Sequence, residues 1–445
     1  MNKEKSSSCV EEQLFNYVKE FSFPRLAGTE GEKKAVEKVY RTFKEIGYEE
    51  DQIEKEPFEF SDFYSTTLVK FIMLLSFNVI LILIFLLYIF YFFTFFIIGV
   101  MVIIMTLILR ALKHPEKMGF WGEYFGDILE ATNVFTKIPA KKLTEQEAGD
   151  IIISAHLDSK SQTFKTSWRI VFYRIWLFSG ILLGGFYIAS LLINLNIFPI
   201  PRISIQFWDI EIFILDLGII GLTLLILISN VFLMFLNTHN KSPGACDNGS
   251  GMAIVFALSQ FFLDHPLDHF NLWFCQFSAE ELGTMGSRIF VNNHDDKFTK
   301  GRIFQINFDM ISAANLRPKK NRVEYLKSYG IFPRKKIAPL LSKYLDEAAK
   351  HEGLEIHGFH LTTGAHTDSV PFHLRGYSSV DIVTRHAARY AHDEIDTPDK
   401  VDPKVLKTAC SIGKRAVLNL DRDYHKLCNN ELLVCVDNKD GINNS

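Results

Sequence analysis

The sequence of 445 residues lacks several features that would point to common classes of protein. Its formal net charge is −3, so it offers no basic surface to a nucleic acid and no acidic tail. Its six cysteines form no CxxC pair and no regular framework, from which we expect reduced thiols, although Cys428 and Cys435 could pair. The first residues, "MNKEKSSSCVEEQ", are polar, so no cleavable signal peptide is expected there.

Apolar residues are what the sequence has in excess. They make up 48% of the chain, with 40 Phe, beside 22% charged residues, which is typical of a part-globular, part-membrane protein. Residues 71–109 contain no charge, and one membrane-spanning helix needs about 20 residues. A second apolar block covers 175–201 and resumes at 217–238. Buried core helices rarely have such long apolar runs, so we predict four transmembrane helices in two hairpins.

The transmembrane segments are expected to be an anchor and not a conduit. Their polar residues are a few Asn, Ser and Thr, with Asp216 near one end, whereas ion pathways normally need ionisable residues inside the membrane. Each hairpin returns the chain to its starting side. We therefore expect residues 1–64, 113–167 and 239–445 to build one domain, interrupted by hairpins at 65–112 and 168–238.

The charges next to the spans predict the orientation of this domain. Arg202 is the one basic residue in the opposite loops. The basic residues on the domain side are Lys70, Arg110, Lys113, Lys117, Lys165, Arg169, Arg174 and Lys241. By the positive-inside rule, the domain lies in the cytosol.

The water-soluble segments alternate between strand and helix patterns. Residues 29–47 form an amphipathic helix that opens with Thr29 and Glu32 at capping-box spacing. The last helix, 403–420, starts after Asp402 as its cap, with Pro403 in its first position. The other predicted elements are strands at 150–158, 271–278, 301–310 and 377–383, and helices at 250–263 and 336–351. This alternation predicts a three-layer α/β/α sandwich with a mainly parallel mixed sheet.

Acidic and His residues gather at the predicted strand ends, where ligand sites of α/β sheets lie. The candidates are His156, Asp158, Asp247, Glu280, Glu281, Asp309 and His392. Most of them, taken singly, are better explained by a turn or a solvated surface. Asp309 is the exception, because a lone carboxylate in an apolar strand is costly to bury without a cation or hydrogen bonds.

Five of these residues, in this order and in these surroundings, resemble the co-catalytic zinc aminopeptidase family, the zinc exopeptidases. The matching stretches are "AHLDS", "GACDNGSG", "AEELGTMGS", "INFDM" and "HDEIDT". The resemblance implies two zinc ions bridged by Asp247. His156 and Asp309 would complete one site, and Glu281 and His392 the other.

The resemblance also implies roles for three further residues. Glu280 would be the general base. The role of Asp158 follows without the family, because it lies two residues beyond His156 along a strand, points the same way and can accept the second ring N–H of His156. The stretch "HTDSVPFHLRGYSS" is similar to the family's substrate side, which implies that Asp368 and Phe372 contact substrate. Histidine and carboxylate donors without cysteine suit zinc, although manganese or cobalt would fit the same set.

The chain departs from the family in its insertions. Residues His156 and Asp247 are 91 positions apart, where the family has a short span, and a second apolar hairpin follows Phe63. Both hairpins are interpreted as insertions in the enzyme, which would place the active site near a membrane surface.

The function we expect is a multi-pass, membrane-anchored zinc metallopeptidase, most simply an aminopeptidase acting on peptides. One alternative is a glutaminyl-cyclase-like acyltransferase, which uses a single zinc ion. The other is an inactive membrane scaffold of the same fold. Both are disfavoured because the chain keeps all five ligands and Glu280.

The predicted orientation can be tested in sealed, right-side-out vesicles. An added protease should leave residues 239–445 uncut, and the variant Arg202→Cys should react with an impermeant thiol reagent. Reaction of Lys300→Cys, with none at Arg202→Cys, would invert the topology.

Overall fold

The computed structural model describes residues 10–197, 204–207, 210–330, 333–362, 367–430 and 432–433. Arg202 and Cys435 lie outside these residues. The chain divides into two compact units. The first comprises Met1–Phe60, Leu129–Ser161 and His239–Ser445, and the second comprises Ser61–Ile128 and Gln162–Thr238.

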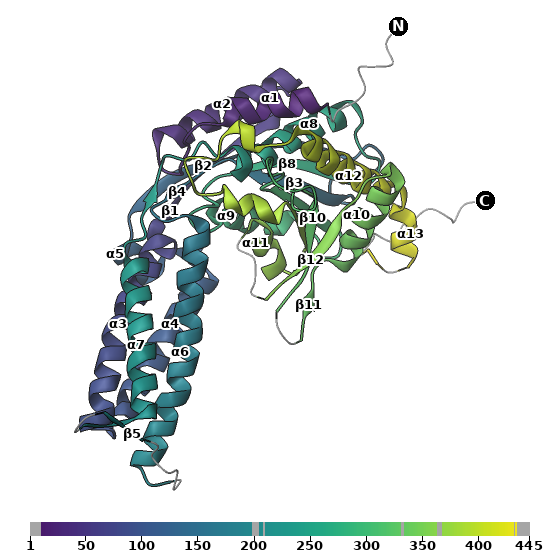
Figure 1. Cartoon of the computed structure of the whole chain (residues 1–445). Coiled ribbons are helices and arrows are strands. Elements are labelled where there is room, and N and C mark those ends of the chain that lie inside the picture. The colour runs from purple at the N-terminus through teal and green to yellow at the C-terminus, as the bar shows by residue number, and fades with distance from the viewer. Residues whose placement is uncertain are drawn as a thin grey trace. The chain divides into compact units, whose positions relative to one another are not determined.

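A nine-stranded mixed sheet forms the centre of the first unit (Figure 1). Its order is β1-β2-β8-β3-β9-β13-β10-β11, and β12 also pairs with β10. The strands are β1 (Ile53–Ser61), β2 (Ile128–Ile138), β3 (Gly149–His156), β8 (Phe270–Phe277), β9 (Ile303–Asp309), β10 (Glu324–Tyr329), β11 (Lys335–Lys336), β12 (His357–Leu361) and β13 (Ser378–Val383).

The four central strands β8, β3, β9 and β13 run parallel. His156 pairs in register with Phe277, and Asp309 pairs with Val383, so these strands end at one edge of the sheet. β2 and β10 flank them in antiparallel orientation. The chain therefore brings the segments that follow β3, β8, β9 and β13 to a single edge.

Helices cover both faces of this sheet. α1 (Glu11–Phe21), α2 (Glu30–Ile46), α8 (Ser250–Asp264), α10 (Pro339–Glu352) and α12 (Pro403–Arg422) share a hydrophobic cluster with Ile151 and Ile153 of β3. α9 (Met285–His294) and α11 (Ser369–Leu374) pack with Ile152 on the other face. A strand directs successive side chains to opposite faces, which explains this division. The predicted three-layer sandwich is confirmed.

The helix ends test the sequence signals directly. Asp402 caps α12, because its Oδ1 accepts a hydrogen bond from the Lys404 amide at 3.0 Å. The capping box predicted for α2 is wrong. Thr29 donates to the carbonyl of Leu26, and Glu32 is buried and accepts hydrogen bonds from the Ser278 hydroxyl and the Thr132 amide. Tertiary partners thus replace the local ones.

The cysteines also depart from expectation. Cys246 and Cys275 are free and buried, but Cys410 and Cys428 are disulfide-bonded. The expectation of reduced thiols is therefore wrong for Cys410, whereas the sequence analysis had left a disulfide at Cys428 open. Irregular spacing in the sequence does not reveal which cysteines the fold brings within bonding distance.

The second unit contains four helices that are long and apolar enough to cross a membrane. They are α3 (Thr66–Ile89), α4 (Phe93–Lys113), α6 (Thr166–Asn194) and α7 (Ile214–Met234), which lie side by side (Figure 1). Only 11% of the most apolar window of α3 is buried, so few of its apolar side chains are enclosed by the rest of the protein. The unit also holds α5 (Gly119–Phe125) and the antiparallel pair β5 (Ser204–Phe207) and β6 (Ile210–Phe213). Among the described residues, the other short strands are β4 (Ser161–Gln162) and β7 (Thr238–His239), and the last α-helix is α13 (Tyr424–Asn429).

Gly251 allows α8 to lie directly against β9. A Cβ atom at Gly251 would lie 2.2 Å from the backbone oxygen of Phe308, whereas one at Gly413 in α12 would meet the Phe308 ring at 2.7 Å. The backbone oxygen of Phe308 cannot move away from an added Cβ atom as easily as the Phe308 ring can. Gly251→Ala should therefore lower the free energy of unfolding by roughly 1–3 kcal/mol, and Gly413→Ala by less. Thermal unfolding of both variants checks this, and an unchanged midpoint for Gly251→Ala would contradict the close packing.

Candidate metal centre

The predicted ligands come from the shared edge of the sheet. His156 is the last residue of β3 and Asp309 the last of β9, while Glu281 follows β8. Asp247 lies in the turn that precedes α8, and His392 follows β13. The carboxyl ends of parallel strands are where α/β sheets bind ligands, and here the topology brings all five side chains together.

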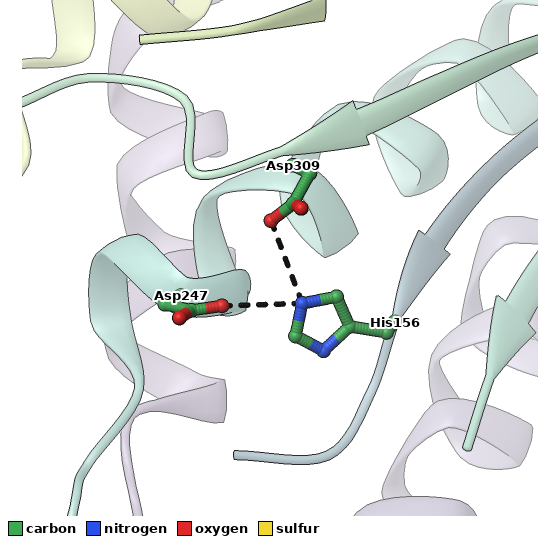
Figure 2. Close-up of side chains that lie close together, drawn as sticks. All are labelled: His156, Asp247 and Asp309. Carbon is green, nitrogen blue, oxygen red and sulfur yellow. Dashed lines mark ion pairs between the residues drawn. The ribbon is translucent and has the colours of Figure 1, made fainter. Parts of the chain in front are cut away.

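The first group consists of His156, Asp247 and Asp309 (Figure 2). His156 Nε2 lies 3.1 Å from Asp247 Oδ1 and 3.5 Å from Asp309 Oδ1. All three residues are buried, with at most 5% of any one exposed. One nitrogen therefore faces two carboxylates in a space that excludes most water.

The second group shares Asp247 with the first and adds Glu281 and His392. His392 Nε2 lies 2.9 Å from Glu281 Oε2 and 3.4 Å from Asp247 Oδ2. The two carboxylate oxygens of Asp247 thus face two different histidines. Within each group, the candidate ligand atoms all lie within 4.8 Å of one another. Asp247 could therefore contribute one oxygen to each group.

Two atoms of the first group show that a cation fits. His156 Nε2 and Asp309 Oδ1 are buried and have no hydrogen-bond partner among the described residues. Buried polar atoms are rarely left in this state without an ion or water to satisfy them. Imidazole nitrogen and carboxylate oxygen together form a donor set that zinc accepts. The side chains therefore match the metal that their sequence pattern implies.

The neighbouring glutamates Glu280 and Glu281 have opposite electrostatic environments. Burial raises the pKa of Glu280 well above its ordinary value, and the nearby carboxylates add to this effect. For Glu281, burial acts in the same direction but is outweighed by His392 and Lys160, which hold its pKa well below the usual range. Glu280 Oε2 lies 3.9 Å from His156 Nε2. A proton is thus retained more readily by Glu280, and Glu281 stays anionic.

Asp158 holds both glutamates through their backbone. Its Oδ1 accepts a hydrogen bond from the Glu280 amide at 3.1 Å, and its Oδ2 accepts one from the Glu281 amide at 3.2 Å. The sequence analysis had predicted that the Asp158 carboxylate bonds His156. The Nδ1 atom of His156 is closer to the backbone oxygen of Asp158, at 3.1 Å, than to the Oδ1 atom of Asp158, at 3.5 Å. Asp158 therefore orients the imidazole mainly through its carbonyl, while its carboxylate fixes the glutamate loop.

Asp396 holds the backbone around Asp247 in the same way, and this role was not predicted from the sequence. Its Oδ1 accepts from the Cys246 amide at 2.7 Å and its Oδ2 from the Asp247 amide at 3.0 Å. Burial raises the pKa of Asp396 to about 7. The residue lies in "HDEIDT", beside His392, so its position near a ligand was the one available signal.

Arg25 was also missed, and it connects three segments beneath the site. The guanidinium is fully buried and donates to five backbone oxygens, those of Phe21, Phe23, Leu157, Pro243 and Gly244. Leu157 separates His156 from Asp158, and Gly244 begins the turn that carries Asp247. Burial lowers the pKa of Arg25 to about 10, and the acidic residues of the site, Asp396 first, oppose this shift. Arg25 stays protonated at neutral pH and contributes positive charge below the carboxylates.

The backbone at the site adopts uncommon conformations. His392, Ala279 and Met310 have φ angles of 62°, 55° and 51°, in the left-handed region that residues other than glycine seldom occupy. Each is a ligand or lies within two residues of one. Such conformations cost about 1–3 kcal/mol apiece and persist only where surrounding contacts fix them, as happens at functional sites.

The two predicted substrate residues lie in different environments. Asp368 precedes α11 and is fully buried, and both of its carboxylate oxygens lack a hydrogen-bond partner among the described residues. Burial raises the pKa of Asp368 to about 7. Phe372 is also fully buried and packs against Phe290 and Tyr377 in the core. Its ring has no exposed surface to offer a substrate, so its place in the structure is that of a packing residue.

Comparisons of sequence find part of this chain similar to known peptidases. The model of peptidase family M28 matches residues 235–415. Aminopeptidase YwaD of Bacillus subtilis (strain 168) is 27% identical over 183 residues, which are 40% of this chain and 37% of YwaD. Leucine aminopeptidase 2 of Trichophyton rubrum is 37% identical over 90 residues, which are 18% of this chain and 17% of that protein. These matches span well under half of each relative.

Comparisons of structure extend the likeness to the whole fold. An aminopeptidase from Aneurinibacillus sp. strain AM-1 matches with a TM-score of 0.52 and 14% identity, covering 93% of this chain and 94% of that one. A zinc aminopeptidase from Bacillus subtilis matches with a TM-score of 0.51 and 14% identity, covering 92% and 95%. The resemblance to the zinc exopeptidases is confirmed. At these identities, the structural likeness is one of fold alone.

Replacing Arg25 tests whether it supports the metal centre of this zinc-exopeptidase fold. Arg302 is a matched control, because it is also buried and donates to a backbone oxygen, that of Glu147, at 2.6 Å. Both Arg25→Met and Arg302→Met should lower the unfolding temperature. Only Arg25→Met should weaken zinc binding, by about 10–100-fold, because it releases the segments that carry His156 and Asp247. Competition with a zinc chelator measures the affinity, and equal values for the two variants would contradict this role.

Proposed function

We propose that the protein is a membrane-anchored metallo-aminopeptidase whose site holds two zinc ions. The observation that carries the proposal is the position of Asp247, whose two carboxylate oxygens face His156 and His392. His156 and Asp309 would complete one site, and Glu281 and His392 the other. Two zinc ions bound there would lower the pKa of a shared water and polarise the scissile carbonyl.

The protein's own contribution to the chemistry centres on Glu280. Its carboxylate lies 3.9 Å from His156 without belonging to either group of candidate ligands. A site that raises the pKa of a carboxyl group prepares it to accept a proton from water and return it to the leaving amine. Asp158 fixes the direction of this side chain, because it holds the amides of Glu280 and Glu281.

A glutaminyl-cyclase-like acyltransferase is the second candidate. The glutaminyl cyclase of an Acidobacteriales bacterium shares the fold, with a TM-score of 0.50 and 15% identity, covering 95% of this chain and 98% of that one. The presence of both complete ligand groups favours the two-metal peptidase, and it also opposes an inactive scaffold. Metal stoichiometry separates the peptidase from both alternatives.

The proposed anchor consists of the four apolar helices. Helix α5 has exposed aromatic side chains, those of Phe120, Tyr124 and Phe125, and it follows shortly after Lys117 in the sequence. This combination of aromatic and basic residues suits the interface of a membrane. The asymmetry of basic residues supports a cytosolic catalytic domain. The disulfide-bonded Cys410 and Cys428 point toward an oxidising compartment. The vesicle experiment decides between these two sides.

Two neighbouring substitutions test the proposed roles. Glu280→Gln should keep the zinc content of the wild type while kcat falls by roughly 100-fold or more, because the proton acceptor is lost. Glu281→Gln, its matched control, should lose zinc, because a charged ligand is replaced by a neutral one. Elemental analysis gives the zinc content, and peptides with free or blocked amino termini give the activity.

Three results would contradict this assignment. One is full activity in Glu280→Gln, which would place the base elsewhere. Another is one zinc ion per chain in the wild type. The third is hydrolysis that does not depend on a free amino terminus, which would exclude an aminopeptidase.

A further inference from the structure

The second unit contains a cavity that the peptidase chemistry does not use. Its volume is about 800 Å³, and it lies where α3 and α6 end and α7 begins. The wall is part apolar and part polar. Leu87, Phe186 and Ile193 provide apolar surface, and Tyr88, Asn194 and Asp216 provide polar groups.

Asp216 gives the cavity its charge. It is the one acidic residue in the sequences of α3, α4, α6 and α7. It lies in the first turn of α7, where the free amides of the helix stabilise a carboxylate. Its Oδ1 accepts a hydrogen bond from the Tyr88 hydroxyl at 2.8 Å. An ionisable side chain among apolar helices is costly and normally has a functional partner.

No basic side chain of the described wall balances the charge of Asp216. No Lys, Arg or His is among the described residues that line the cavity. The polar groups beside Asp216 are hydroxyls and amides, which add hydrogen-bonding capacity without charge. Among the described residues of the wall the charge of Asp216 is unmatched, and a ligand with one positive charge would balance it.

The size and apolar wall of the cavity define the rest of the ligand. A single metal ion would leave most of the 800 Å³ empty, whereas organic ligands occupy cavities of about 300–1,000 Å³. Apolar surface from Leu87, Phe186 and Ile193 calls for an apolar body. A zwitterionic phospholipid fits less well, because its phosphate would find no cationic side chain in the described wall.

We propose that this cavity binds a lipid-like amphiphile with a single amine or quaternary ammonium group. The ammonium group pairs with Asp216 and the apolar body packs against Phe186 and Ile193. This site is separate from the metal centre in sequence and in chemistry, and the proposal does not depend on the peptidase function.

The test uses the full chain in a neutral maltoside detergent. Native mass spectrometry measures binding of decyltrimethylammonium, with decanol as an uncharged probe of similar length. The wild type should bind one decyltrimethylammonium and bind decanol at least tenfold more weakly. Asp216→Asn should reduce the affinity for the ammonium on the order of tenfold, the effect of removing a partly buried charge partner.

Three further variants keep the result interpretable. Asp216→Glu retains the charge and should retain most of the binding. Tyr187→Phe removes a hydroxyl from α6 that bonds Thr94 and Leu83 and does not line the cavity, so it should leave the affinity unchanged. Phe186→Ala should weaken binding by removing apolar contact. Equal affinity for the charged and uncharged probes, or unchanged affinity in a folded Asp216→Asn, would overturn the proposal.

Discussion

The burial of several carboxylates at one edge of the sheet is the constraint that shapes the first unit. Asp158, Asp247, Glu281, Asp309 and Asp396 are all at most 6% exposed. Charges of one sign, held so close together and away from water, repel each other and lose their hydration. The fold compensates them with the buried Arg25 guanidinium and with Lys160, whose ammonium lies 3.0 Å from Glu281. Metal ions at His156 and His392 would provide the remaining positive charge.

The same carboxylates also determine the backbone around the ligands. Asp158 and Asp396 each accept hydrogen bonds from two successive amides, and in both cases at least one of these amides belongs to a candidate ligand. Asn248 adds a third connection, because its side chain bonds the carbonyl of Phe308 and the amides of Gly251 and Met310. The ligands are thus positioned by buried polar contacts as much as by the sheet. This is consistent with the left-handed conformations of Ala279, Met310 and His392.

The sequence predicted what depends on local pattern. Periodicity indicated α2, α8 and α12, and short apolar runs indicated β3, β8 and β9 within a few residues of their observed ends. It also indicated the five ligand candidates, because their residue types and neighbours resemble a known family. It could not predict the contacts of Arg25, whose partners Leu157 and Gly244 lie 132 and 219 residues away. The contacts of Glu32 could not be predicted for the same reason. Its side chain bonds Ser278 across the core and not the expected capping partner at the start of its own helix.

The place of the second helix pair within the chain also affects when the metal centre can exist. His156 precedes α6, and Asp247 follows α7. The other three ligand candidates come later still. During synthesis, which proceeds from the amino terminus, a chain that has just completed α7 possesses one of the five candidate donors and therefore cannot hold the proposed pair of ions. The proposed hydrolytic activity would appear only after these apolar helices have been made, so the nascent polypeptide would be inert toward its neighbours until then.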